Sequence, residues 1–188
     1  LVQPALACGY RFEDEALVDE MVGEVQKERG ALPLVAFAAS RLWEKRDREK
    51  GLLTREAYRE IGGVAGALAQ HAEATLERIG TQRTPLVREL FRNLVTAQGT
   101  RAVREREELL SVFGASGSRA EAEGVLNALV DARLLTSYER AGDSGGSHQQ
   151  VEIIHESLLQ AWPRLVRWQT QDADGALAML DRGVGHAG

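Results

Sequence analysis

The stretch LLTSYERAGDSGGSHQQVEIIH, residues 134–155, decides the fold of the C-terminal half of the chain. Its beginning, Leu134–Arg140, and the apolar run Val151–Ile154 both favour β-strands. Between them lies a loop rich in glycine and serine, Ala141–Ser147. Two short β segments joined by such a loop are typical of a hairpin. We therefore predict a β-hairpin with a long tip, followed by an amphipathic helix over His155–Trp168.

The segments before this hairpin have mostly helical periodicity. Thr84–Pro85 is a typical helix start, and an apolar face follows it until Gly99, which is expected to end the helix. A short strand is expected over Arg101–Arg104, then a second helix, then a third helix capped by Ser118. The order helix, strand, helix, helix, hairpin predicts a winged helix.

The N-terminal half has the pattern of several amphipathic helices. Apolar residues recur at helical spacing after the acidic run Glu13–Glu15, after Pro33 and after Thr54, a suitable helix cap. Gly62–Gly63 is expected to separate two helices. The fold class is therefore predicted as mainly α. The predicted domains are a helical bundle, a winged-helix domain with a small β-hairpin, and a partly flexible C-terminal linker, over residues 1–82, 83–172 and 173–188.

The composition narrows the class of protein. The 188 residues are 44% hydrophobic and 27% charged, with a net charge of −5, which is ordinary for a soluble globular protein. This excludes disordered chains, collagen and basic nucleic-acid scaffolds. No run approaches the roughly 18 to 20 apolar residues of a membrane span. A lone cysteine, Cys8, and the lack of a signal-peptide pattern favour the cytoplasm. Because the chain starts at Leu1 without a methionine, we expect it to be a piece of a longer protein.

Several catalytic motifs are absent from the sequence. There is no G-x-x-x-x-G-K-[ST] loop and no G-x-G-x-x-G motif, so the chain is not expected to cradle a triphosphate unaided. The four histidines lack the spacing of metal ligands, and no nucleophile-elbow sequence occurs. We therefore expect no catalytic residues, no metal site and no enzyme activity in this piece alone.

Two local features stand out as candidate binding sites. In Gly30–Leu34, GALPL, a glycine and a proline frame the start of an apolar helix. At Ile154–Glu156, a histidine lies where an apolar strand gives way to a helix, beside backbone amides that could bind an anion. Each feature also has a structural interpretation: a turn with a proline helix start, and a histidine that caps or packs. Both interpretations stay open from these residues alone.

In combination and order, these motifs resemble the STAND signalling ATPases, and most closely their bacterial novel-STAND branch. The resemblance covers roughly residues 5–172. It rests on three segments, which are Gly30–Trp43, Gly62–Leu68 and His155–Pro163.

The resemblance implies a nucleotide-dependent switch. In STAND proteins a P-loop core precedes a helical lid and a winged helix, and ADP is clamped among the three. The lid motif would place Gly30, Leu32 and Pro33 at the nucleotide, with Pro33 on the adenine. His155 would bind the ADP β-phosphate, with Glu156 in place of the family's aspartate. ADP or ATP and Mg²⁺ would bind only together with the upstream core.

The resemblance also implies partners within the same protein. These are the upstream P-loop core and downstream sensor repeats, such as a WD-repeat propeller. A homo-oligomer is expected in the active state.

Two other functions compete with this one. A winged helix often reads DNA, but the helix expected over Arg119–Arg133 has two arginines against three acidic residues, a net charge of −1, which repels phosphate. The hairpin tip contains Asp143 and no lysine or arginine. DNA binding is therefore not expected. A nucleotide-independent interaction scaffold remains if Pro33 and His155 are only structural.

Overall fold

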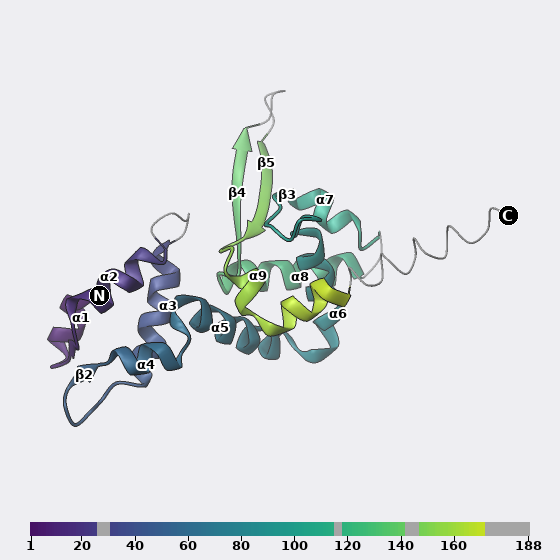
Figure 1. Cartoon of the computed structure of the whole chain (residues 1–188). Coiled ribbons are helices and arrows are strands. Elements are labelled where there is room, and N and C mark those ends of the chain that lie inside the picture. The colour runs from purple at the N-terminus through teal and green to yellow at the C-terminus, as the bar shows by residue number, and fades with distance from the viewer. Residues whose placement is uncertain (26–30, 115–117, 142–146, 172–188) are drawn as a thin grey trace. The chain divides into compact units, whose positions relative to one another are not determined.

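The computed structural model describes residues 1–25, 31–114, 118–141 and 147–171. The chain divides into two compact units, Leu1–Ala74 and Thr75–Gly188, which are described separately below. Most described residues are helical, and the larger of the two small sheets has three antiparallel strands (Figure 1). The predicted mainly α class is confirmed. The linker predicted over 173–188 lies outside the described residues.

The N-terminal unit, unit 1, consists of helices and one pair of very short strands. Its elements are α1 (Val2–Ala7), β1 (Arg11–Phe12), α2 (Glu15–Gly23), α3 (Ala31–Glu44), β2 (Leu52–Leu53), α4 (Arg55–Glu60) and most of α5 (Gly63–Ile79). The strands pair in parallel, with Arg11 opposite Leu52 and Phe12 opposite Leu53. This pairing was not predicted, because two-residue strands have no readable periodicity.

Capping side chains set the starts of two helices in unit 1. Asp14 accepts a hydrogen bond from the Leu17 backbone N–H at 2.7 Å. Thr54 accepts one from the Ala57 N–H at 3.2 Å, so the predicted Thr54 cap is confirmed. Each bond satisfies an amide that has no partner within its own helix.

The corner between α4 and α5 is held by Glu24. Gly62 and Gly63 both have positive φ, 78° and 68°, as expected for the glycine pair between two helices. The Glu24 carboxylate accepts hydrogen bonds from the Tyr58 hydroxyl at 2.9 Å and from the Val64 N–H at 3.1 Å. The end of α2 is thereby fixed to both helices of the corner. The fully buried residues of unit 1 include Leu17, Met21, Leu34, Leu42 and Leu68.

The C-terminal unit, unit 2, has the predicted order of elements. After the end of α5 come a 3₁₀ turn (Thr81–Arg83), α6 (Thr84–Asn93), β3 (Arg104–Glu105), α7 (Arg106–Ser111), α8 (Ser118–Asp131), β4 (Leu135–Ala141), β5 (Ser147–Ile153), α9 (Leu158–Ala161) and a helix over 163–171.

The hairpin prediction is confirmed. β4 and β5 stand side by side as two long strands (Figure 1), with Leu135 opposite Ile153. β3 adds to the other edge of β5, so the strand order is β3-β5-β4. β5 begins at Ser147, earlier than the predicted start at Val151. Its first half is polar and was not recognised as a strand, but it also pairs with β4.

Several helix boundaries in unit 2 differ from prediction. Ser118, predicted as a cap, is the first residue of α8. Thr84 likewise is the first residue of α6. α6 ends at Asn93, and Gly99, with a φ of 74°, belongs to a separate turn closed by the Thr96 N–H on the Thr100 carbonyl. The helix predicted over His155–Trp168 is broken in two, because Trp162 is extended (ψ 105°) before Pro163. A residue before proline is disfavoured in the helical region, and proline lacks the N–H to continue the ladder.

This break lets the aromatic residues of unit 2 meet. Trp162, which is 1% exposed, packs edge-on against Phe91 of α6 and against Trp168, with ring centroids 5.4 and 5.6 Å apart. The cluster ties the C-terminal helix to α6. Within the described ranges, no helix is long and apolar enough to cross a membrane.

Candidate functional site

The junction after β5, residues 154–157, is the candidate site in unit 2. Ile154 donates its N–H to the Leu134 carbonyl at 3.0 Å, so the last pairing of the hairpin leads directly into His155. The His155 side chain is buried, with the residue 8% exposed. A buried ring here has a fixed orientation, because the chain on its N-terminal side is anchored to the sheet.

Hydrogen bonds within the junction define the chemistry of the His155 ring. Its Nδ1 accepts the Ser157 backbone N–H at 3.0 Å and also contacts the Ser157 hydroxyl. When Nδ1 is an acceptor, the neutral ring carries its proton on Nε2. The ring therefore has Nε2–H as its donor, the kind of group that a phosphate oxygen requires, and this nitrogen is itself buried in unit 2.

The backbone amides beside His155 do not supplement this donor, contrary to the sequence-based expectation. The N–H groups of Leu158 and Leu159 donate to the carbonyls of His155 and Glu156, at 3.2 and 3.0 Å, and the Ser157 N–H is taken by the ring. In addition, α9 covers only Leu158–Ala161, because Pro163 follows so soon. The amides of Ser157, Leu158 and Leu159 are thus already engaged and add no donor to that of the imidazole.

Arg101 contacts the junction from both sides of His155, and the sequence analysis missed this role. Its Nε donates to Glu156 Oε2 at 2.9 Å, and its Nη1 donates to the carbonyls of Ile153 and Ile154 at 3.1 and 3.5 Å. Arg101 was expected in a strand. It instead forms an isolated β-bridge with Val95, and β3 begins only at Arg104. More than fifty positions separate the partners, so no local pattern points to the contact.

The lid motif lies in unit 1. Gly30 is outside the described residues, and Leu32 and Pro33 belong to the first turn of α3, as predicted for a proline helix start. Their side chains are outside the described part of the chain. Since His155 belongs to unit 2, the two candidate features are described in separate units.

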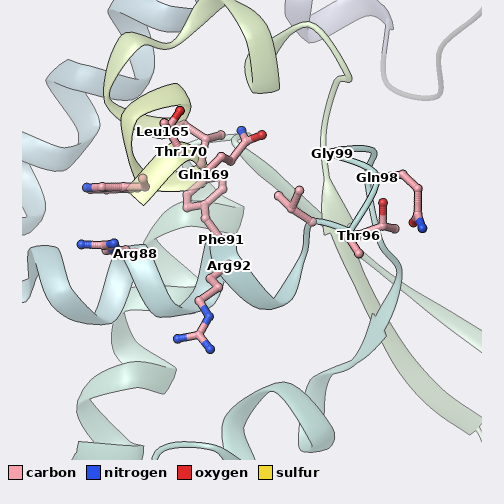
Figure 2. Close-up of a pocket in the computed structure, with 12 residues that line it drawn as sticks. Arg88, Phe91, Arg92, Thr96, Gln98, Gly99, Leu165, Gln169 and Thr170 are labelled. Carbon is pink, nitrogen blue, oxygen red and sulfur yellow. The ribbon is translucent and has the colours of Figure 1, made fainter. Parts of the chain in front are cut away.

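Unit 2 also has a groove, of about 610 Å³, between α6, the 95–99 turn and the C-terminal helix (Figure 2). Phe91 and Leu165 contribute apolar surface, and Gln169 and Thr170 contribute polar groups. Among the described residues that line the groove, Arg88 and Arg92 are charged and none is acidic. Arg92 is paired with Glu89, with Nη1 and Oε2 3.4 Å apart, so part of the positive charge at the groove is already neutralised.

Other classes of site are not apparent in the described residues. Across those ranges, no three histidine, cysteine or acidic side chains gather as a metal site. The basic residues beside α8 are paired with acids: Arg119 with Glu107, and Arg106 with Glu123 at 3.0 Å.

Comparison with known families tests the resemblance. The family model described as novel STAND NTPase 1 matches residues 1–182. No curated protein and no solved structure matches the chain. The match spans the bundle, the hairpin and the His155 junction, and the chain therefore belongs to the novel STAND NTPase 1 family.

Proposed function

We propose that this chain is the regulatory region of a STAND-type signal-transduction ATPase, and that it clamps ADP and controls oligomerisation. In this proposal a P-loop core elsewhere in the same protein binds ATP or ADP with Mg²⁺ and hydrolyses ATP. The 188 residues themselves are then a nucleotide-dependent switch and not an enzyme. Sensor repeats would supply the stimulus.

The observation that carries the proposal is the fixed Nε2–H donor of His155. A mostly buried ring, oriented by Ser157 and anchored through Ile154, loses little freedom when it meets a phosphate oxygen. The unit 1 motif Gly30, Leu32 and Pro33 would contact the base of the same nucleotide.

The switch follows from differential affinity. If His155 binds the β-phosphate only when ADP is present, ADP stabilises the closed state, and exchange for ATP removes that stabilisation. The freed units then expose surfaces for self-association. A ligand with equal affinity for both states would shift nothing, so the His155 contact has to differ between them.

The charge of α8 favours the nucleotide-dependent switch over DNA binding. α8, the counterpart of a recognition helix, contains three acidic residues and one arginine, and that arginine is paired with Glu107. Duplex binding depends on free cations facing phosphates. A scaffold without nucleotide is the other alternative, and it predicts that His155 contributes only packing.

The test compares His155→Ala with His148→Ala in the protein that contains both the P-loop core and this chain. His148 lies on β5 and its side chain is 48% exposed, so it serves as a matched control. A hydrogen bond to a charged group contributes about 1.5–3 kcal/mol, so ADP affinity should fall about ten- to a hundredfold. Co-purified ADP, oligomer mass and melting temperature are measured together.

The two functions give different outcomes. Loss of ADP with a larger oligomer in His155→Ala, and no change in His148→Ala, supports the switch. An unstable, monomeric His155→Ala protein that retains its ADP contradicts it and favours the scaffold.

A further inference from the structure

The guanidinium of Arg101 bonds to residues both before and after His155. Three of its hydrogen bonds reach the Ile153 carbonyl, the Ile154 carbonyl and the Glu156 carboxylate. The direction of the His155 Cα–Cβ bond depends on the backbone at 154–156. Arg101 therefore acts on the part of the chain that aims the imidazole.

The environment of Arg101 makes these bonds effective. The side chains of Arg101 and Glu156 are 24% and 39% exposed, so the guanidinium is better shielded from water than the carboxylate. Charge-assisted hydrogen bonds are stronger than neutral ones, and a planar fork serves several acceptors in a fixed geometry. A lysine at this position has a compact ammonium in place of the planar fork, so it does not match the geometry of the carboxylate and the two carbonyls.

The ion pair also explains the glutamate at position 156. The Glu156 carboxylate neutralises Arg101 at 2.9 Å, so the arginine is already engaged and need not be a phosphate ligand itself. An aspartate is one methylene shorter and would withdraw the carboxylate from this distance. The length of the Glu156 side chain thus suits its ion pair with Arg101.

We propose that Arg101 is a positioning residue, which holds the backbone around His155 so that Nε2–H meets the β-phosphate of ADP. This inference rests on the proposed function of His155. It adds a residue that touches no nucleotide and acts through another side chain.

The experiment measures affinity for ADP and for a non-hydrolysable ATP analogue in the protein with its P-loop core. Arg101→Gln is compared with Arg104→Gln as a matched control. Arg104 is a nearby arginine on β3 that donates to the Asn93 carbonyl at 3.2 Å. Arg101→Gln should lower ADP affinity about tenfold and leave affinity for the ATP analogue within about twofold, because only the ADP state contains the His155 contact. Arg104→Gln should leave both affinities unchanged.

A double-mutant cycle separates positioning from packing. In the His155→Ala background, Arg101→Gln should change ADP affinity by less than about twofold, because residues that act through one contact are not additive. Independent, additive losses contradict the inference. An equal loss of affinity for ADP and the ATP analogue also contradicts it, since that is the signature of a merely structural residue.

Two further results keep the inference separable from the proposed function. If His155→Ala loses ADP and Arg101→Gln does not, the inference is wrong while the proposed function stands. If His155→Ala retains ADP, the proposed function fails first, and the inference with it. Should Arg101→Gln not fold, Arg101→Lys replaces it. A wild-type ratio of ADP to ATP-analogue affinity in Arg101→Lys overturns the inference, and a lowered ratio supports it.

Discussion

Replacing Gly66 by alanine should destabilise unit 1, although alanine is the better helix former. An ideal Cβ on Gly66 lies 2.2 Å from the Ile61 carbonyl oxygen and 3.0 Å from its carbon. Carbon–oxygen contacts in proteins are ordinarily about 3.3 Å or longer, so α4 and α5 would have to separate by about 1 Å. The Gly66 N–H also donates to the Gly62 carbonyl at 2.9 Å, and this bond resists the shift.

The magnitude follows from two opposing effects. Overpacking typically costs about 1–3 kcal/mol, and a clash with backbone belongs at the upper end because no side chain can turn aside. Alanine regains about 1 kcal/mol of helix propensity. The free energy of unfolding of unit 1 should therefore fall by about 2 kcal/mol, which for a unit of this size lowers the melting temperature by about 10 °C.

Gly124→Ala in α8 is the matched control. Nothing lies within 4 Å of a Cβ built there, so only the propensity gain applies, and unit 2 should become more stable by about 0.5–1 kcal/mol. Thermal unfolding of both variants is followed by far-ultraviolet circular dichroism. A Gly66→Ala protein that melts at or above the wild-type temperature would refute the close approach of α4 and α5.

Three further predictions concern titration and the lid motif. Burial and the Glu24 hydrogen bond raise the pKa of Tyr58 above its ordinary 10.0. The protonated Tyr58 therefore contributes its full stabilisation of the folded state below pH 10, and this contribution is lost as the pH rises further. Tyr58→Phe should abolish this alkaline loss of melting temperature, and an unchanged pH profile would contradict the assignment. The Arg55 hydrogen bond lowers the pKa of Asp14 below 3.8, so its contribution is present above pH 3.8 and is lost as the pH falls below that value. Asp14→Asn should flatten the acid limb of the stability profile, and a profile as steep as the wild type would count against the pair. In the protein with its P-loop core, Pro33→Ala should co-purify with less ADP at an unchanged melting temperature, whereas equal retention would make Pro33 merely a helix start.

Short sequence patterns were sufficient to predict those parts of the fold that depend on residues close together in the chain. Thr54, the Gly62–Gly63 pair and the hairpin strands were predicted because caps, positive φ and alternation are encoded within a few positions. The end of α6 was predicted six residues too late, because Leu94 and Val95 continue its apolar face although the chain has already left the helix. Leu94 is fully buried by tertiary packing, which periodicity cannot distinguish from a helix position.

The same reasoning pointed to only one of the two residues discussed at the candidate site. His155 was singled out because it lies where an apolar strand gives way to a helix, a place where backbone amides could bind an anion. Arg101 was not, because its partners lie 52 to 55 positions away in the sequence and its own neighbours suggest an ordinary strand. The break between α9 and the C-terminal helix could have been predicted from Pro163, because the residue before a proline disfavours the helical conformation. The regular apolar spacing across this point instead suggested one continuous helix.

The aromatic clusters also make each unit separately observable by light. Of the three tryptophans, Trp162 and Trp168 belong to the packed cluster of unit 2. Trp43 belongs to unit 1, where the Arg46 guanidinium lies 4.5 Å from its ring. Intrinsic fluorescence of a Trp43→Phe protein then reports the burial state of unit 2 alone. The protein thus contains its own optical probes for asking which of the two units unfolds first.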